Sequence, residues 1–416
     1  MQDFNGFETL PRRRGSGSWL THAIVAVLAA GIAVAIFIGF FRPASGGFQP
    51  GIGAVPAPPA SAAPIAGGQQ DIVAKVSPGL VLINTTLQYN SEAAAGTGMV
   101  INADGLVLTN NHVIRGSTRI TATVVATGKT YQAQVVGYDV TGDIALIQLQ
   151  HASGLTVVPI GSSSAAKAGD AVVALGNAEG QGKITAAAGH VTALNATITA
   201  SDQAGSTSTE TLHGMIQTNA DIQPGDSGGP LAGPAGVIGM DTAGNAAGDM
   251  QGPAAGFAIP IDTALAVARQ IAAGHSSSVI TIGYPPFIGV FIGSGSSSDP
   301  QAQAQQQGQG SGAFSGSGST PGCYNSNTDL MVPSSIAPVG SGTLIDGTIC
   351  GSPAAAAGMT GGAVITAVNG QAAGSPDDFA SIMARFHPGD TVSFTWVSPS
   401  GQRTTSSLHL TAGPPQ

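Results

Sequence analysis

The stretch Gln223-Pro-Gly-Asp-Ser-Gly-Gly-Pro230 decides how the chain is interpreted, because glycines flank a serine in it. Glycine lets the backbone turn sharply and so presents the hydroxyl of Ser227. The same turn directs main-chain amides toward one point, where they can stabilise a developing oxyanion. We therefore expect Ser227 to be a nucleophile, and the main chain of Gly225, Asp226 and Ser227 to form the oxyanion hole.

A nucleophilic serine needs a base and a residue that orients the base. The run Gly105-Leu-Val-Leu-Thr-Asn-Asn-His-Val-Ile114 places His112 at the end of an apolar strand, and Gly142-Asp-Ile-Ala-Leu-Ile147 places Asp143 just before another. The order His, Asp, Ser is that of the chymotrypsin arrangement rather than of subtilisins or α/β-hydrolases. The sequence thus predicts a catalytic triad of His112, Asp143 and Ser227.

Composition narrows the class of protein. Short β-branched runs separated by Gly, Asn and Asp recur over residues 70–274 and predict a barrel or sandwich, closed by a helix that stops at Gly274. Only 8% of residues are charged and the net charge is −9, which gives no electrostatic footprint for nucleic acid. The two cysteines, Cys323 and Cys350, are too few for a metal cluster and suit one disulfide in an oxidising compartment.

An apolar segment near the amino terminus, residues 19–41, is long enough to cross a hydrocarbon core of about 30 Å. Arg12–Arg14 precede it and Arg42 follows, so the positive-inside rule predicts a cytoplasmic tail over residues 1–18 and the remainder outside. The alternative is a cleaved signal peptide and a secreted protein. Residues 42–69 are rich in Pro, Ala and Gly and predict a linker that holds the next domain off the membrane.

Six segments together resemble a known family. They are AGTGMVI, GLVLTNNHVI, GDIALIQL, VVALGNAEG, QTNADIQPGDSGGPL and GFAIP, all within residues 70–274. In this order they resemble the HtrA/DegP-like trypsin-like serine proteases, above all the secreted or membrane-anchored bacterial members with a C-terminal PDZ domain. The resemblance implies a mainly β, chymotrypsin-like double β-barrel, endopeptidase activity, and neither cofactor nor metal. Related proteases are often trimers, so it also makes a homo-oligomer an expectation.

Residues 284–412 resemble a PDZ domain with a low-complexity insertion, residues 293–321, which we expect to be disordered. The segment that resembles the carboxylate-binding loop consists of Phe287, Ile288, Gly289 and Val290. In such a loop, backbone amides take the terminal carboxylate of a peptide. The sequence departs from the family at Ala363, where Asp is usual, and in the insertion after the loop.

Two acids near Ser227 have open interpretations. Asp221 stands where trypsin carries the acid at the base of its specificity pocket, and a buried carboxylate there would select Arg or Lys. The alternative is a loop aspartate turned to solvent. Asp226 is Asn in many HtrA proteins; in trypsin-like zymogens this acid pairs with a new amino terminus. Cleavage before Ile72 would supply such a terminus, although the segment also matches the helix that precedes the protease domain in HtrA proteins.

The leading hypothesis is an extracytoplasmic serine endopeptidase that cleaves misfolded or specific envelope and exported proteins through an acyl-enzyme. Its PDZ domain would bind peptides or regulate the active site. The alternative is a latent or weakly active protease fold that serves as a chaperone or peptide-binding module. In either case the expected partner is a polypeptide.

Overall fold

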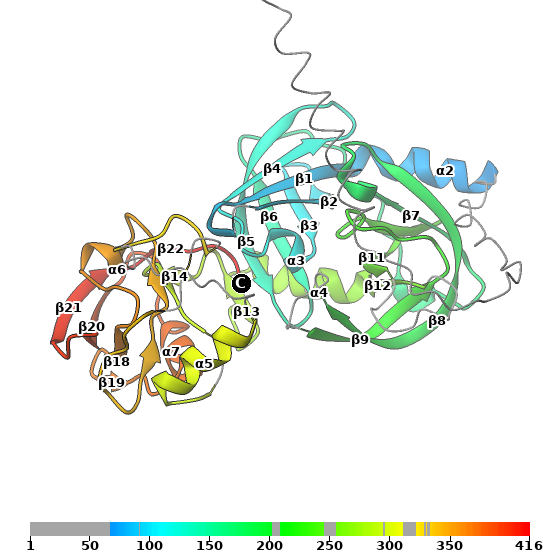
Figure 1. Ribbon diagram of the computed structural model, residues 1–416. Coiled ribbons are helices and arrows are strands. Elements are labelled where there is room, and N and C mark those ends of the chain that lie inside the picture. The colour runs from blue at the N-terminus through cyan, green and yellow to red at the C-terminus, as the bar shows by residue number, and fades with distance from the viewer. Residues whose placement is uncertain are drawn as a thin grey trace, which may run out of the picture. The chain divides into compact units, whose positions relative to one another are not determined.

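The computed structural model describes the part of the chain that carries the candidate triad and the part that follows it (Figure 1). The predicted tail, the predicted anchor (residues 19–41) and the linker up to residue 66 lie outside the described residues. Among the described residues, no helix is both long and apolar enough to cross a membrane. The described residues are 67–90, 92–201, 209–244, 255–293, 296–310, 322–327, 330 and 333–416.

The first sheet consists of β1 (Leu80–Leu87), β2 (Glu92–Asn102), β3 (Leu106–Thr109), β4 (Arg119–Val124), β5 (Thr130–Asp139), β6 (Ile144–Leu149) and β13 (Ile280–Ile282). Its strand order is β13-β5-β4-β1-β2-β3-β6, and it closes on itself because β5 also pairs with β6. Buried and more exposed residues alternate along its strands. In β4, Ile120, Ala122 and Val124 are buried and the residues between them are not, so one face of the strand packs into the barrel. Because β13 belongs to this sheet, the domain extends beyond its predicted limit at residue 274.

The second sheet is a closed barrel of β7 (Ala171–Gly176), β8 (Thr185–Ser201), β9 (Thr209–Thr218), β10 (Pro230–Gly233), β11 (Gly236–Gly244) and β12 (Gly256–Pro260). Met99 and Leu108 of the first barrel share one buried apolar cluster with Leu175, Met240 and Ile259 of the second. The two barrels are therefore packed on a common core, which confirms the predicted chymotrypsin-like double barrel.

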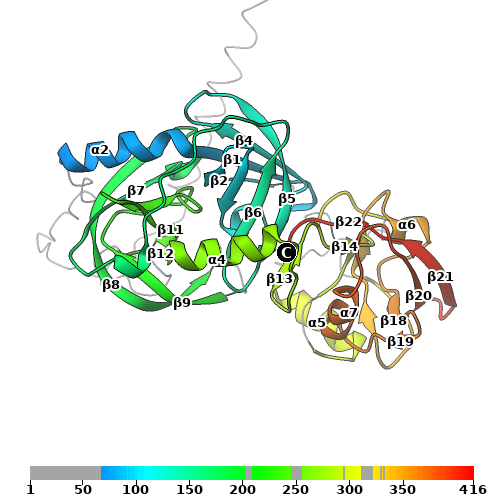
Figure 2. The same ribbon diagram turned by 180° about the vertical axis from the view of Figure 1, so that it is seen from behind.

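Helices complete this part of the fold. The longer ones are α2 (Gly67–Val76) and α4 (Ile261–Ala272); the short ones are α3 (Asn111–Ile114), η1 (Ser77–Gly79), η2 (Gln88–Asn90), η3 (Ser163–Ala165) and η4 (Ala178–Gly180). Figures 1 and 2 show α2 along the second barrel, and α4 contacts strands of both barrels. Helix α4 buries Ala264, Ala268 and Ile271 and ends before Gly274, whose φ of +73° suits a helix stop, as predicted.

The C-terminal elements have a core of their own, which contains Ile365, Phe379, Phe394, Trp396 and Leu408. A five-stranded sheet has the order β16-β18-β20-β21 with β19 on β18, while β14 pairs with β22 and β15 with β17. The elements are β14 (Pro286–Phe287), β15 (Val290–Phe291), α5 (Pro300–Gly310), β16 (Thr343–Leu344), β17 (Gly347–Thr348), α6 (Pro353–Ala356), β18 (Val364–Val368), β19 (Gln371–Ala372), α7 (Pro376–Met383), β20 (Thr391–Val397), β21 (Arg403–His409) and β22 (Thr411–Ala412).

The predicted disulfide is confirmed: Cys323 and Cys350 are bonded to each other. Main-chain hydrogen bonds flank the bond on both sides, because Tyr324 donates to Thr348 and Cys350 donates to Tyr324, each at 2.8 Å. Residues 322–327 are thereby fastened to the segment that follows β17.

Helix α5 contradicts the predicted disorder of residues 293–321 over part of that stretch. Asp299 accepts a hydrogen bond from the amide of Gln301 at 2.9 Å, and Pro300 opens the helix. An aspartate cap followed by a first-turn proline is a helix-start signal, which the low-complexity composition masked.

Buried Gln303 fixes α5 to the sheet. The residue is 4% exposed; its Nε2 donates to the carbonyl of Gly342 at 2.7 Å, and its Oε1 accepts from the amide of Leu344 at 2.8 Å. The side chain thus continues the hydrogen bonding of β16 as a strand would.

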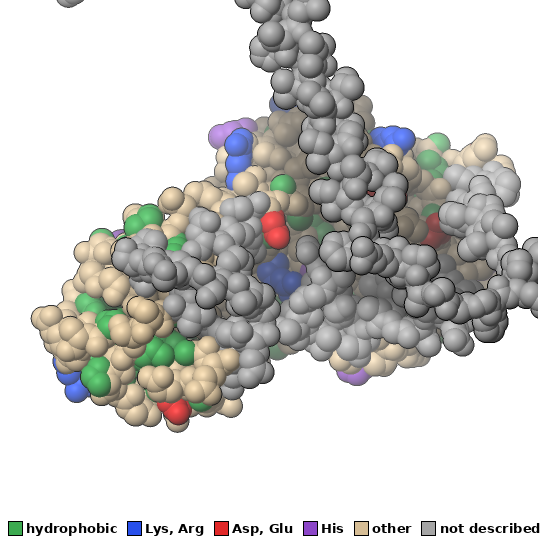
Figure 3. Space-filling view, viewed as in Figure 1, with side chains coloured by type: hydrophobic (Ala, Val, Ile, Leu, Met, Phe, Trp, Pro, Cys, Tyr) green, Lys and Arg blue, Asp and Glu red, His purple; other side chains and the backbone are tan. Residues whose placement is uncertain are grey.

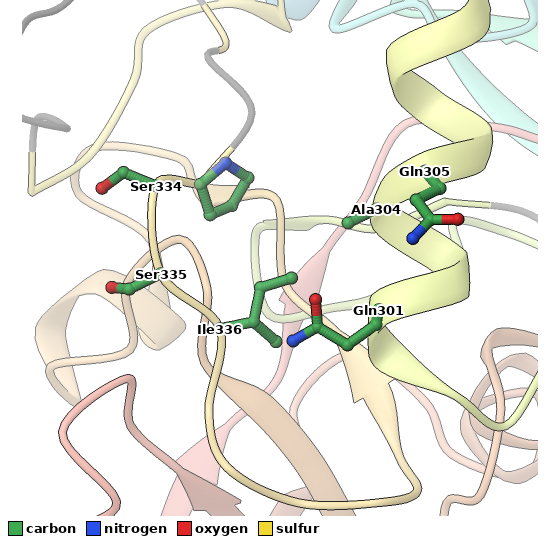
Figure 4. Close-up of a pocket in the computed structure, with 7 residues that line it drawn as sticks. Gln301, Ala304, Gln305, Ser334, Ser335 and Ile336 are labelled. Carbon is green, nitrogen blue, oxygen red and sulfur yellow. The ribbon is translucent and has the colours of Figure 1, made fainter.

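The surface near α5 is shallowly hollowed. Figure 4 shows the pocket between α5 and the loop at residues 333–336, lined by Gln301, Ala304, Gln305, Pro333, Ser334, Ser335 and Ile336. It contains no nucleophile–base pair and is not the candidate site. On the coloured part of the face in Figure 3, charged side chains lie apart in small groups rather than in a patch of one sign.

Replacing Gln303 by alanine should leave a buried carbonyl and a buried amide unpaired. Each unpaired group costs about 1–3 kcal/mol, so we expect the free energy of unfolding of the C-terminal domain to fall by about 2–4 kcal/mol. Urea unfolding followed through the fluorescence of buried Trp396 measures it. Exposed Gln301→Ala on the same helix is the matched control and should change stability by less than about 0.5 kcal/mol. Equal effects of the two substitutions would contradict the docking role of Gln303.

Candidate active site

His112 lies on a one-turn helix that directly follows a barrel strand. Strand β3 ends at Thr109, and Asn110 in an extended conformation precedes α3. Val113 and Ile114 are buried and hold the helix against the first barrel. The imidazole remains at the edge of the barrel, with 24% of the His112 side chain exposed.

Asp143 lies in the turn between β5 and β6 with φ of +51°, a left-handed conformation that few residues other than glycine adopt. Asn110 Nδ2 donates to its carbonyl at 2.9 Å and stabilises the turn. The buried carboxylate accepts hydrogen bonds from Nδ1 of His112 at 2.9 Å and from the His112 amide at 3.0 Å. This contact assigns the ring proton to Nδ1 and leaves Nε2 as the acceptor that a general base requires.

Thr242 on β11 joins Asp143 to Ser227. Its hydroxyl donates to Oδ2 of Asp143 at 2.5 Å, and its main-chain oxygen accepts from Oγ of Ser227 at 3.2 Å. The structure therefore brings the three predicted triad residues together through one buried threonine. Sequence analysis missed Thr242; its signal was the polar pair Asp241-Thr242 within an otherwise apolar strand.

The loop that carries Ser227 is fastened by Thr97 of β2. The amide of Thr97 donates to the carbonyl of Ser227 at 2.9 Å, and its hydroxyl donates to the carbonyl of Gly225 at 2.8 Å. Gly228 follows with φ of +83°, and a Cβ there would lie 2.2 Å from the main-chain carbonyl oxygen of Thr97. Only glycine therefore permits this approach of the loop to the first barrel.

One of the three predicted oxyanion donors, the amide of Asp226, has another hydrogen-bond acceptor. The amide of Asp226 donates to the carbonyl of Gln223 at 3.0 Å, so it is engaged within the loop. The carbonyl of Pro224 accepts from the amide of Glu179 at 2.6 Å. Because the C=O and N–H of a trans peptide point in opposite directions, this bond turns the amide of Gly225 away from Glu179. The amides of Gly225 and Ser227 remain the predicted pair.

Asp226 and Asp241 are buried acids behind Ser227. Asp226 is 4% exposed, and its Oδ2 accepts from the amide of Gln223 at 2.9 Å. Burial raises the pKa of Asp226 to about 6, and the charge of Asp221 adds to the rise. Burial raises the pKa of Asp241 well above its usual range, and the charge of Asp226 adds to it.

The remaining predicted residues lie elsewhere. Asp221 is exposed and accepts from Nε2 of Gln223 at 2.5 Å, as in the solvent-facing alternative. Ile72, where zymogen cleavage would occur, is buried in α2. Among the described residues, no three His, Cys, Asp or Glu side chains gather in a way that could hold a metal ion.

In the segment Phe287–Val290, Phe287 ends β14, Ile288 and Gly289 connect the two strands, and Val290 begins β15. Gly289 has φ of +77°, and a Cβ there would lie 2.2 Å from Ser352. The carbonyls of Ile288 and Gly289 accept from the amides of Ala354 and Ile349, each at 2.9 Å. Within the described part of the chain, the amides of Ile288 and Gly289 have no hydrogen-bond acceptor.

Replacing the main-chain amide of Glu179 by an ester should remove the N–H that orients the Pro224–Gly225 peptide, without the φ of about −65° that proline would impose on the loop. The loss of one oxyanion donor lowers kcat about 10²–10³-fold, and we expect a fall of that order with KM little changed. Steady-state cleavage of a peptide substrate measures both constants. Glu179 has φ of +56°, so Glu179→Gly keeps the amide without strain and should retain the wild-type kcat. A similar kcat for both variants would exclude this role.

Replacing Asp226 by asparagine should stabilise the protein above pH 6. Burial raises the pKa of Asp226 from 3.8 to about 6 in the folded protein, so the carboxyl contributes stability only while protonated and loses it as pH rises through this range. The variant should exceed the wild type by about 3 kcal/mol at pH 7 and by little at pH 3. Denaturant unfolding at several pH values tests this, and a pH-independent difference would contradict it.

Comparison with known proteins agrees with this geometry. The trypsin-like peptidase domain family matches residues 96–240. The serine protease PepD of Mycobacterium tuberculosis is 31% identical over 406 residues, which cover 93% of this chain and 76% of PepD. The periplasmic pH-dependent serine endoprotease DegQ of Escherichia coli is 40% identical over 178 residues, which cover 42% of this chain and only 37% of DegQ.

The HtrA-type protease AlgW with a tripeptide is 26% identical with a TM-score of 0.42, and the match covers 83% of this chain and 98% of that chain. The family assignment rests instead on the peptidase-domain match and on PepD, which the chain resembles over most of both lengths. The chain belongs to the HtrA family of trypsin-like serine endopeptidases.

Proposed function

We propose that the protein cleaves polypeptides outside the cytoplasm through a serine acyl-enzyme, with His112, Asp143 and Ser227 as the catalytic triad. The observation that carries this proposal is the shared contact of Asp143. Its carboxylate binds Nδ1 of His112 at 2.9 Å and also the hydroxyl of Thr242, whose carbonyl accepts from Ser227. Base, orienting acid and nucleophile are thus linked through buried groups.

In the reaction, Oγ of Ser227 attacks the carbonyl carbon of the substrate while Nε2 of His112 takes the hydroxyl proton. Asp143 stabilises the imidazolium that forms. The amides of Gly225 and Ser227 receive the oxyanion, since neither has a main-chain acceptor among the described residues. His112 then gives the proton to the leaving amine, and water releases the acyl group by the reverse sequence.

The C-terminal domain supports a second element of the proposal, a PDZ domain that binds peptides and regulates cleavage. The amides of Ile288 and Gly289 are unpaired in the described structure, which suits binding of a terminal carboxylate. The carbonyls of the same residues are fixed by the segment that starts α6, so the loop is held in one conformation. Ala363 is buried, and because it is an alanine it offers no carboxylate at the position where the family usually has Asp.

An extracytoplasmic location is supported by two observations. The disulfide between Cys323 and Cys350 suits an oxidising compartment. Relatives such as DegQ are named periplasmic. We propose a single-pass anchor over residues 19–41 with the domains outside the cytoplasm, or secretion after cleavage of that segment. The substrates would be misfolded or specific exported proteins, and the enzyme would act as a homo-oligomer, such as a trimer.

Asp221 extends the proposal to specificity. Its carboxylate is exposed in the loop before Ser227, so it would favour Arg or Lys before the cleaved bond by attraction across solvent and not as a buried charge at the base of a pocket. A neutral residue at this position would leave small aliphatic side chains equally acceptable.

Labelling with a fluorophosphonate and cleavage of a peptide library test the proposal. The full-length protein should label and cleave, and Ser227→Ala should lose labelling and at least about 10⁴-fold in kcat/KM. Exposed Ser400→Ala is the matched control and should behave as wild type. Cleavage after Arg and Lys that disappears in Asp221→Ser would support the specificity proposal. Absence of labelling, with or without added peptides, would instead favour a chaperone or peptide-binding module.

A further inference from the structure

Asp226 and Asp241 are both buried, and the loop that carries the two predicted oxyanion donors links them. Main-chain bonds join them: Gly229 donates to Asp226 and accepts from Asp241, and Gly228 donates to Asp241, each at 2.8 Å. Asp226 stands between Gly225 and Ser227 in the chain. Any movement of its side chain out of the interior would therefore rotate both of those amides.

The carboxyl groups of this pair have oxygens without a hydrogen-bond donor. Oδ1 of Asp226 and both carboxyl oxygens of Asp241 are buried, and none of them has a hydrogen-bond partner among the described residues. The packing is tight, because a Cβ on Gly176 would lie 2.5 Å from Oδ1 of Asp226. If both carboxylates were ionised they would repel each other in this interior of low dielectric constant, and the charge of Asp226 does raise the pKa of Asp241.

A shared proton removes this conflict. A neutral carboxyl group has one O–H donor, whereas an ionised one has acceptors only. The carboxylate of Asp226 already accepts from the Gln223 amide, which favours its ionised form, while the carboxyl group of Asp241, a residue that is 0% exposed, accepts no hydrogen bond from the described residues. The proton therefore belongs on Asp241, and the unpaired Oδ1 of Asp226 is the acceptor beside it.

We infer that Asp241 remains protonated at neutral pH and donates its O–H to Asp226, and that this shared proton holds the Ser227 loop in its active conformation. Loss of the proton at alkaline pH leaves two charges in the interior. Asp226 then turns to solvent and carries the amides of Gly225 and Ser227 out of position. Asp226 and Asp241 are thus positioning residues that set an upper pH limit for the enzyme.

The charged groups described near the pair are either acidic or exposed. From its own loop Asp226 faces Asp221, another acid, and β11 contributes only Asp241 itself. On η4, Glu179 is exposed, and the charged residues Asp71 and Lys75 of α2 are exposed as well. Strands β2 and β7 present Thr97 and Gly176 to the loop. Among the described residues, no lysine, arginine or histidine contributes to the pKa of either acid.

The pH dependence of kcat/KM in the full-length protein tests the inference. The wild type should lose activity on the alkaline side, and Asp241→Asn, which can donate a hydrogen bond but not ionise, should move that loss up by at least about one pH unit. The acid limb, which reports the base His112, should be the same in both. Asp262→Asn removes an exposed carboxylate of α4 and is the matched control, with a wild-type profile. An unchanged alkaline limb in a folded Asp241→Asn protein would overturn the inference.

A second measurement does not depend on the variant. Carbon-13 NMR of the wild type, labelled at the aspartate carboxyl groups, should show a buried carboxyl that is still protonated at pH 8. If all aspartates of the folded protein are ionised at pH 8, Asp241 holds no proton and the inference is wrong, whatever the kinetics show.

Discussion

Buried Thr97 holds the active site together through its side chain and its main chain. Thr97 lies in the first barrel, yet its amide and hydroxyl fix two carbonyls of the Ser227 loop in the second. Its own carbonyl accepts from the hydroxyl of Thr109, and its hydroxyl oxygen accepts from the amide of Asn177. The geometry of the site therefore depends on how the barrels pack, and not on the serine loop alone. A shift of either barrel would separate the nucleophile from its base.

The double-barrel fold was predictable from sequence, and the triad could be proposed from it, because both rest on local patterns. Glycines around Ser227, an apolar run before His112 and another after Asp143 each act within a few residues. Thr242 was not predictable in this way, because its role is a hydrogen bond to a residue 99 positions away. Residues that support a site across a domain boundary have no local pattern to reveal them.

Two further differences from the sequence predictions have physical causes. Helix α5 formed within a low-complexity segment because Asp299 caps it and Gln303 replaces a strand partner. The amide of Asp226 is not an oxyanion donor because the loop turns tightly enough to pair it with Gln223. In both places a few specific hydrogen bonds determine the local conformation. The average composition of a segment does not reveal such bonds.

The pairing of β14 with β22 also determines how the C-terminal domain is connected to the chain. Pro286 and Phe287 at its start lie opposite Ala412 and Thr411 at its end, so the domain begins and ends at neighbouring points of its own surface. A unit whose two ends are adjacent can be inserted, exchanged or circularly permuted without threading the chain through its core. This connectivity leaves both chain ends of the C-terminal sheet at one place, next to the strand pair β14–β22.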